Sequence, residues 1–153
     1  MAKFNFKSVG IKNDQQPITG SSLPIGIRTP LQLGKQGIGI FAMHTSLADQ
    51  LADNLRNLLN TNHGERLGLY DFGANLAPLT LDFTSREDFD SEAIIRIRTA
   101  VQKYMPFINL KTFESKIDRF NNQVVGKITV NITYDIPQLA ATERQIAVTL
   151  YVT

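Results

Sequence analysis

Apolar residues recur at helical spacing in two stretches of the chain. The first stretch is a stripe of five leucines, at Leu47, Leu51, Leu55, Leu58 and Leu59. Residues three or four positions apart share one face of an α-helix, so this stripe predicts an amphipathic helix with Asp49 and Asp53 on its polar side. Thr45 or Ser46 can cap its first turn, and the run from Asn60 to Gly64 ends it with turn-forming residues.

A second helix is predicted between about Asp90 and Met105. Its apolar face consists of four residues, Ile94, Ile97, Val101 and Tyr104. Asp90 or Ser91 suits the N-cap, and Glu92 favours the positive end of the helix dipole. Pro106 ends the helix, because a residue that precedes proline is disfavoured in helical angles.

The last third of the chain alternates apolar and polar residues, which is the period of β-strands with one buried face. The apolar positions are Ile128, Val130, Ile132 and Tyr134 in one strand and Ile146, Val148, Leu150 and Val152 in the next. A less regular run from Phe107 to Ile117 predicts a strand before them, and Arg119–Asn122 suits a hairpin connection. The order of elements indicates an α+β fold, in which two main helices pack on a small antiparallel sheet of about three to four strands.

The first 36 residues differ from the rest. Pro17, Pro24 and Pro30 interrupt them, together with several glycines, and no helical or alternating period persists. Five basic residues stand against a single acidic one, Asp14. Such a stretch buries little surface by itself, so we predict an extended basic N-terminal arm at 1–36 and a folded domain at 37–153. Two hypotheses stay open for the arm: a terminus without a partner, or a segment that orders against partner subunits.

Composition places the chain among ordinary soluble globular proteins. It has 153 residues, of which 42% are hydrophobic and 20% are charged, which is enough for one domain with a core. The net charge of +2 is too small to indicate nucleic acid or a membrane as a partner. No stretch approaches the roughly 20 apolar residues of a membrane span, and the N-terminus lacks the apolar core of a secretory signal. We therefore expect a soluble protein that is cytoplasmic when made.

Few residues of the chain suggest chemistry. There is no cysteine and there are two histidines, His44 and His63, so neither a thiolate site nor a cluster of metal ligands is indicated. No catalytic serine motif occurs, and the glycines Gly34, Gly37 and Gly39 match neither the phosphate-loop nor the dinucleotide pattern. We expect His63 to be a solvated loop residue, and we expect no cofactor and no metal.

Glu65 and Asp71 lie close enough in the sequence to be considered as a glycosidase pair. However, Arg66 follows Glu65, and its charge favours the ionised carboxylate and so opposes a general acid. The chain has no Trp to form a sugar platform, and Tyr70 and Phe72 are the aromatic residues of this loop. A structural Glu65–Arg66 pair is the better interpretation, so we predict no enzymatic activity.

The loop between the two predicted helices carries a specific pattern. It contains Thr61-Asn62-His63-Gly64-Glu65-Arg66, then Phe72-Gly73, then Leu76. This pattern resembles the Thr-x-x-Gly-Glu-Arg and Phe-Gly-x-x-Leu segment of the phage baseplate wedge and sheath-initiator family, also called tail lysozyme-like. That family includes a baseplate subunit of type VI secretion systems. Its leucine-rich helix before the loop and its Tyr-x-Pro helix end after it are matched here too, so the resemblance covers residues 38 to 153.

A structural role for this loop follows from its residue types. The residues concerned are Gly64, Glu65, Arg66, Phe72 and Gly73. Gly64 allows a left-handed turn after the helix. Glu65 and Arg66 can bond the backbone or each other, and Phe72 can anchor the loop in the core before the chain turns at Gly73.

The resemblance also implies two contact sites. The family docks on the wedge core through Glu-Pro-Arg at the end of its second helix, where this chain has Met105, Pro106 and Phe107. The contact would then be apolar; the alternative is that Met105 and Phe107 belong to the core. The sheath-facing strand would be the last one, with the residues Ile146, Val148, Leu150 and Val152. An exposed edge strand offers unpaired backbone groups that an incoming sheath strand can satisfy.

The resulting hypothesis is a virion protein, a structural wedge subunit of a contractile-tail baseplate that docks on the wedge core and nucleates sheath polymerisation. Its partners would be other wedge proteins and the tail sheath protein, with tube or hub proteins contacted by the arm. It would act in the tail baseplate and be assembled in the host cytoplasm. Two alternatives stay open: a peptidoglycan-cleaving tail lysozyme, and a wedge adaptor without sheath contact.

Overall fold

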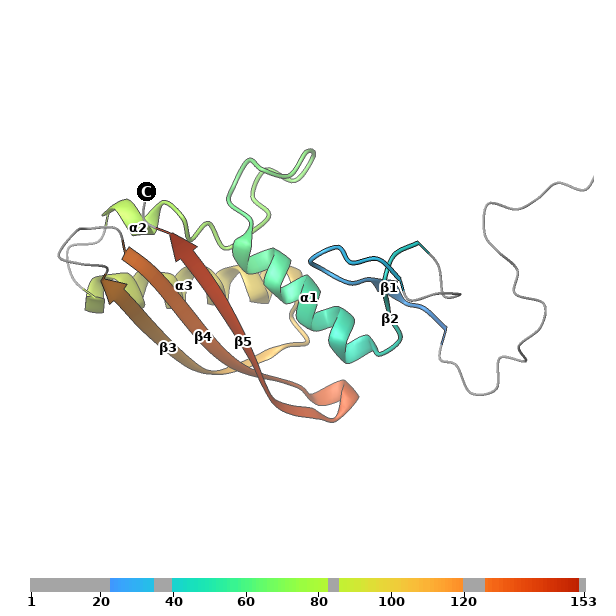
Figure 1. The fold of residues 1–153 in the computed structure, drawn as a ribbon. Coiled ribbons are helices and arrows are strands. Elements are labelled where there is room, and N and C mark those ends of the chain that lie inside the picture. Colours follow the sequence, from blue (N-terminus) through green and yellow to red (C-terminus); the bar gives the residue numbers. More distant parts are fainter. Residues whose placement is uncertain (1–22, 35–39, 83–85, 120–125, 152–153) are drawn as a thin grey trace, which may run out of the picture. The chain divides into compact units, whose positions relative to one another are not determined.

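A computed structural model of the chain describes residues 23–34, 40–82, 86–119 and 126–151 (Figure 1). The chain divides into two compact units, Met1–Asp53 and Asn54–Thr153. Helix α1 (Leu47–Asn60) begins in the first unit and ends in the second. A division near residue 36 stays a prediction. None of the helices within the described ranges is long and apolar enough to cross a membrane.

The first unit contains a short antiparallel ladder. β1 (Gly26–Ile27) pairs with β2 (Met43–His44), and an isolated bridge joins Leu33 to Phe41. The N–H of Ile25 extends the ladder by donating to the carbonyl oxygen of His44 at 2.8 Å. Backbone bonds between such short segments leave no alternating side-chain period, so the sequence did not predict this ladder. Residues 1–22 of the predicted arm lie outside the described residues.

Helix α1 confirms the leucine stripe. Leu55, Leu58 and Leu59 are fully buried, whereas Leu47 at the start of the helix is exposed. The stripe therefore enters the core progressively along the helix. Asp53, which was predicted on the polar side of this helix, is buried.

The second predicted helix is longer than expected. α3 (Arg86–Tyr104) begins four residues earlier than predicted, since Phe89 is fully buried and Glu87 and Asp88 stabilise the first turn. It ends at Tyr104, one residue before Met105, as the proline at 106 requires. A short helix that the sequence did not predict, α2 (Leu79–Asp82), precedes α3.

Three long strands form the antiparallel sheet of the second unit. They are β3 (Asn109–Arg119), β4 (Gly126–Ile136) and β5 (Ala141–Tyr151). They lie in the order β3-β4-β5, and α3 runs along one face of the sheet (Figure 1). The predicted alternation is confirmed, because the apolar residues of β4 lie opposite those of β5: Ile128 opposite Leu150, Val130 opposite Val148 and Ile132 opposite Ile146.

The connections of the sheet were less predictable than its strands. A short 3-10 turn, Pro137–Leu139, joins β4 to β5, so β5 begins several residues before the predicted alternation. The predicted hairpin connection at Arg119–Asn122 falls largely outside the described residues, as does Val152.

The core of the second unit is formed by the end of α1, by α3 and by one face of the sheet. Its largest fully buried side chains are Leu55, Leu58, Leu59, Leu76, Phe89, Ile97, Val101, Ile128, Val130, Tyr134, Ile136 and Val148. The α+β class is confirmed, with main helices and an antiparallel sheet in the predicted order. This core supports the loop between α1 and α2, which carries the pattern found in the sequence.

Candidate functional site

The loop after α1 begins with a carboxylate cap. Glu65 accepts hydrogen bonds from the backbone N–H of Asn62 at 2.8 Å and from its side-chain amide at 2.9 Å. Both bonds stabilise the ionised carboxylate and lower the pKa of Glu65. The carbonyl oxygen of the Asn62 amide in turn accepts a bond from the Ala77 N–H at 3.2 Å. Glu65 and Asn62 therefore close the base of the loop.

Of the two contacts predicted for Glu65, the bond to the backbone is confirmed, and the pair with Arg66 is wrong. Glu65 is occupied by Asn62, and the guanidinium of Arg66 lies instead over the ring of Phe72, 4.3 Å from its centroid. Adjacent residues in a tight turn direct their side chains apart, whereas Phe72 returns to the same place from the other side of the loop. Arg66 thus contributes a cation–π contact rather than an ion pair.

Two glycines allow the loop to turn. Gly64 has φ +87° and confirms the predicted left-handed turn, while Gly73 has φ +115°. The N–H of Gly64 donates to the carbonyl oxygen of Tyr70 at 2.7 Å, which closes the outer part of the loop. His63 is exposed in the same turn, as predicted.

The middle of the loop is tied to the end of α3. Asp71 forms an ion pair with Lys103 and accepts a hydrogen bond from the Tyr104 hydroxyl at 3.0 Å. Lys103 and then Tyr104 lower the pKa of Asp71, and Asp71 raises the pKa of Lys103. The ring of Tyr104 meets that of Phe72 edge to face, with centroids 4.9 Å apart. Phe72 is half-buried, so it anchors the loop against Tyr104 rather than in the centre of the core.

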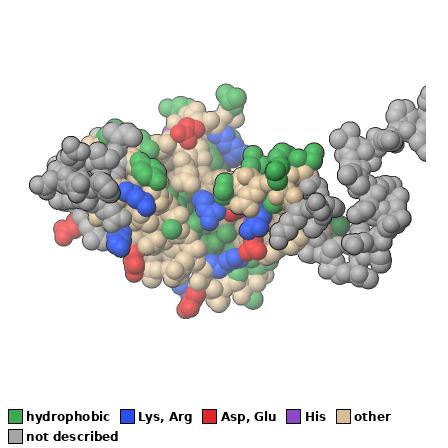
Figure 2. Space-filling model, in the orientation of Figure 1, with side chains coloured by type: hydrophobic (Ala, Val, Ile, Leu, Met, Phe, Trp, Pro, Cys, Tyr) green, Lys and Arg blue, Asp and Glu red, His purple; other side chains and the backbone are tan. Residues whose placement is uncertain are grey.

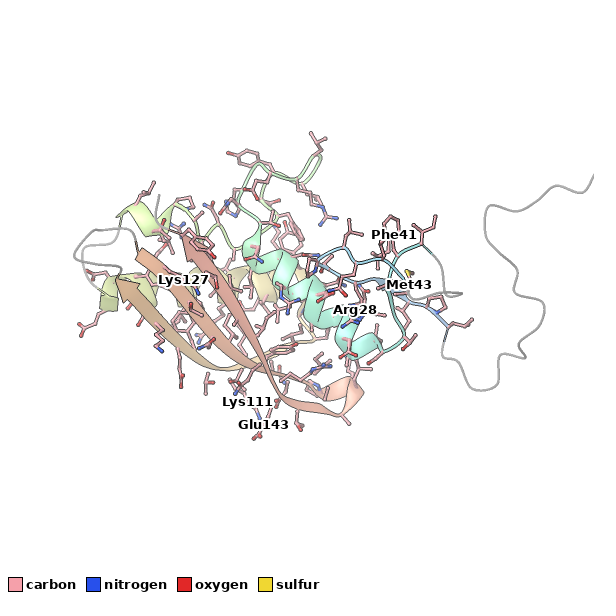
Figure 3. The ribbon with its side chains drawn as sticks, in the orientation of Figure 1. Arg28, Phe41, Met43, Lys111, Lys127 and Glu143 are labelled. Atoms are coloured by element: carbon pink, nitrogen blue, oxygen red, sulfur yellow. The ribbon has the colours of Figure 1, made fainter. Side chains whose placement is uncertain are left out.

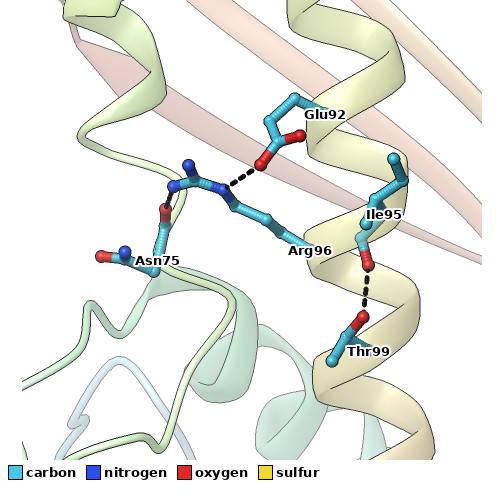
Figure 4. Close-up of polar contacts among 5 residues, drawn as sticks. All are labelled: Asn75, Glu92, Ile95, Arg96 and Thr99. Carbon is cyan, nitrogen blue, oxygen red and sulfur yellow. Dashed lines mark hydrogen bonds and ion pairs between the residues drawn. The ribbon is translucent and has the colours of Figure 1, made fainter.

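The end of the loop is tied to the middle of α3 by one arginine (Figure 4). Arg96 donates to the backbone oxygen of Asn75 at 2.8 Å and to the carboxylate of Glu92 at 2.9 Å. Asn75 has φ +51°, an unusual conformation for a residue other than glycine. Arg96 and Glu92 are four residues apart on one helix, and this pair orients the guanidinium toward the loop.

The two carboxylates that a glycosidase would need are both held in the ionised form. Hydrogen bonds lower the pKa of Glu65, and Lys103 and Tyr104 lower the pKa of Asp71. A general acid requires the opposite shift, toward a protonated carboxyl at working pH. No group of three or more His, Asp or Glu side chains that could hold a metal occurs among the described residues.

The predicted wedge contact at the end of α3 is only partly accessible. Met105 is 6% exposed and its N–H continues the helix by donating to Val101. Pro106 is exposed and Phe107 is half-buried. The structure therefore places Met105 in the core, as the alternative interpretation expected, and a docking role at Pro106 and Phe107 stays a prediction.

The predicted sheath-facing strand, β5, lies at an edge of the sheet. Ile146, Val148 and Leu150 point into the core, and Val152 lies outside the described residues. A partner at this edge would therefore meet the backbone of β5 and not these side chains. Charged residues gather at the end of the sheet where β3 begins and β4 ends. Lys111 pairs there with Asp135 at 2.6 Å, and Glu143 lies beside Lys111 (Figure 3).

A buried hydrogen-bonded pair in the first unit was not predicted from the sequence. His44 Nε2 and Asp53 Oδ2 are 2.7 Å apart, and the N–H of Thr29 donates to the same oxygen at 2.8 Å. Burial opposes the charge of Asp53, but the bonds from His44 and Thr29 outweigh it and lower its pKa to about 2. Nothing in the spacing of these three residues signals the contact, because it depends on how β1 and β2 lie beside the first turns of α1.

The fold and the site together define an α+β domain whose inter-helix loop is held by hydrogen bonds and an ion pair. A family model described as "Baseplate wedge protein gp25" matches residues 45–140, which is more than half of the chain. The chain belongs to the baseplate wedge protein gp25 family, and the resemblance read from the loop is confirmed. It is accordingly a structural baseplate component of a phage or phage-like tail.

Two solved structures share the fold. One, from Geobacter sulfurreducens, carries the provisional name tail lysozyme; it is 20% identical, with a TM-score of 0.59 over 73% of this chain and 97% of that one. The other is a chain in the baseplate of the anti-feeding prophage (AFP), 16% identical, with a TM-score of 0.56 over 71% of this chain and 81% of that one. At these identities the likeness concerns the fold alone. A comparison with curated protein sequences gives no significant match.

Proposed function

We propose that this chain is a non-catalytic wedge subunit that nucleates sheath polymerisation by offering the free edge of β5 to the first ring of sheath. The observation that carries the proposal is the position of β5, which pairs with β4 on one side and has no neighbour on the other among the described strands. An edge strand presents a row of unpaired N–H and C=O groups, and an incoming strand can satisfy them.

The two edges of the sheet differ in charge, and the difference favours β5. The segment Gln145–Tyr151 of β5 has no charged residue. On the opposite edge, β3 carries Lys111, Glu114 and Lys116, and its ladder is irregular between Leu110 and Thr112. Charged residues and bulges protect an edge from pairing with another chain. The uncharged segment Gln145–Tyr151 of β5, which lies beyond Glu143 and Arg144, is thus the part of the sheet edge suited to strand addition.

A charge on the β5 edge tests this proposal without opening the core. Ala147 is exposed on β5, so Ala147→Lys should leave the fold intact while opposing the approach of another strand. We expect baseplates that contain the variant but carry no polymerised sheath. The matched control is Thr112→Lys on the exposed edge of β3, which should assemble normal sheathed tails. Normal sheaths with folded Ala147→Lys, seen by electron microscopy, would contradict the proposal and favour a wedge adaptor.

The remaining contacts proposed for the protein lie elsewhere on the chain. Pro106 and Phe107 would contribute to docking on the wedge core, with Met105 supporting them from within the domain. Contacts of residues 1–36 with tube or hub proteins rest on the sequence alone, as does assembly in the host cytoplasm.

The lysozyme alternative finds no support in the geometry of the loop. Its two candidate carboxylates are held ionised by Asn62 and by Lys103, and neither is placed as a proton donor. Digestion of purified cell wall by the folded protein, abolished by Glu65→Gln, would establish the enzymatic alternative. We expect no digestion above that of a heat-denatured sample.

A further inference from the structure

The outer end of the loop after α1 exposes large apolar side chains. We name the residues Arg66–Tyr70 the loop tip. Within it Leu67 is fully exposed, at 100%, Tyr70 is 76% exposed and Leu69 is 43% exposed. Hydrophobic side chains are visible on the surface where this loop projects above α1 (Figures 1 and 2). One exposed leucine is ordinary, but three apolar residues within four positions form a surface that water solvates poorly.

Backbone hydrogen bonds hold the loop tip in one conformation. Gly64 N–H donates to Tyr70 at 2.7 Å, Leu69 N–H donates to Arg66 at 3.2 Å, and Phe72 N–H donates to Leu69 at 3.1 Å. Below the tip, Glu65 and Asp71 fasten the two legs of the loop to Asn62 and to α3. The exposed side chains therefore project from a backbone whose conformation is already fixed, which reduces the entropy lost on binding.

Arg66 is a charged side chain of the loop tip that forms no ion pair with the two carboxylates of the loop. The carboxylate of Glu65 is bonded by Asn62, and that of Asp71 is paired with Lys103. Among the described residues Arg66 has no carboxylate partner, since its guanidinium lies over the Phe72 ring. The tip therefore combines apolar side chains with a guanidinium that has no carboxylate partner in the described part of the chain, and Tyr and Arg are among the residues enriched at the centres of protein interfaces.

We propose that the loop tip inserts into an apolar pocket bordered by at least one carboxylate on a neighbouring baseplate protein. The proposal rests on the baseplate role of the chain and adds a contact distinct from the β5 edge. Leu67 and Tyr70 fill the pocket, and Arg66 pairs with the carboxylate at its rim. The tie between Asp71 and α3 fixes the direction in which the tip points.

A protein pocket fits the tip better than a lipid surface does. A loop that enters an anionic membrane normally surrounds its apolar residues with cations. Here the carboxylates of Glu65 and Asp71 lie in the same loop, and both would be brought near the lipid head groups. A protein partner can accommodate those charges at the rim.

The absence of cysteine from the chain allows a direct test. Leu67→Cys places a single thiol at the tip, and Leu81→Cys places one on α2, where the leucine is also largely exposed. Both thiols are labelled with a maleimide in the free protein, in isolated baseplates without sheath, and in baseplates dissolved in denaturant. We expect the thiol at position 67 to react at least about tenfold more slowly in baseplates than in the free protein, and to regain full labelling in denaturant. The thiol at position 81 should react at similar rates in all three.

Each other outcome overturns the proposal in a distinct way. Equal reactivity at position 67 in free protein and baseplates would show that the tip stays in solvent. Protection that appears only after sheath is added would make sheath the partner, and equal protection of both thiols would reflect general exclusion of the reagent. If neither the Leu67→Cys chain nor the Leu81→Cys chain is found in baseplates, the proposed function fails together with this inference. If the free protein sediments with phosphatidylserine vesicles and Leu67→Ser abolishes this, the partner is a membrane.

A substitution at the tip supplies a second measurement. Leu67→Ser removes exposed apolar surface without touching the core, so the midpoint of unfolding should stay unchanged. Incorporation of the variant into baseplates should fall at least about tenfold, whereas Leu81→Ser should incorporate like the unmodified chain. Normal incorporation of folded Leu67→Ser would overturn the proposal.

Discussion

At Gly73 the chain passes so close to Thr61 that a Cβ atom on Gly73 would lie 2.1 Å from the Thr61 carbonyl oxygen. This approach brings the returning leg of the loop against the end of α1. It is reinforced by a hydrogen bond from the N–H of Ala74 to Leu58 at 3.0 Å. The Phe-Gly part of the loop pattern therefore has a packing cause, since no side chain fits at the second position.

Gly73→Ala is expected to destabilise the protein by at least about 2 kcal/mol, because the methyl group meets backbone and the residue has φ +115°. The free energy of unfolding in urea measures the effect. Gly68→Ala is the matched control: it also has a positive φ, but nothing lies within 4 Å of the added methyl group. The control should cost only about 1 kcal/mol of left-handed strain. Equal losses in the two variants would contradict the steric explanation.

Tyr104→Phe is expected to loosen the loop without unfolding the domain. The change removes the hydroxyl that donates to Asp71 and keeps the ring against Phe72. Because Asp71 and Lys103 are both about half exposed, the loss of global stability should be small. Hydrogen exchange measures the local effect: the amides of Leu69 and Phe72 should exchange faster, while those of β4 should not change. Unchanged exchange in the loop would show that Asp71 and Lys103 hold it alone.

Substitutions at Met105 and at Pro106 are expected to have different effects, the first on stability and the second on docking. Met105→Ala removes a buried side chain and should cost about 2–5 kcal/mol in the free energy of unfolding. Pro106→Ala changes an exposed residue that follows α3, so stability should change by less than about 0.5 kcal/mol. If Pro106 contributes to the wedge contact, incorporation into baseplates falls for this variant even though its melting temperature is retained. Full incorporation would remove Pro106 from the docking site.

Asp53 is expected to make stability depend on acid pH. Its pKa is lowered to about 2 in the folded protein from 3.8, so the folded state binds fewer protons than the unfolded state between these values. The contribution of Asp53 to stability is therefore complete above pH 4 and is lost as the pH falls toward 2. A shift of this size corresponds to about 2 kcal/mol.

Urea unfolding at pH 5 and at pH 2.5 measures this dependence. Asp53→Asn should lose part of the difference between the two pH values, because it cannot ionise. His44→Asn removes the main bond that lowers the pKa of Asp53. The pKa of Asp53 in the folded protein should therefore rise, and the difference in stability between the two pH values should become smaller. An identical pH difference in the unmodified chain and in Asp53→Asn would contradict the assignment.

Local pattern was sufficient for most of the secondary structure. The leucine stripe of α1 and the alternation at Ile128–Tyr134 each depend on neighbours along the chain, so the sequence could predict both. The earlier start of α3 was not predictable in this way, because it depends on the burial of Phe89 against the rest of the domain. The β1–β2 ladder was not predicted either, because it is formed by backbone hydrogen bonds between segments that are separated in the sequence.

The sequence by itself determined the α+β class, the helices and strands of the second unit and the loop pattern that marks the baseplate wedge family. It also identified Gly64, Gly73 and Phe72 as residues with a structural role. Only the tertiary structure decided that Arg66 lies over Phe72 instead of pairing with Glu65, that Asp53 is buried beside His44, and that β5 is an edge strand. These three facts depend on which distant segments meet, and neither periodicity nor residue type along the chain encodes that information.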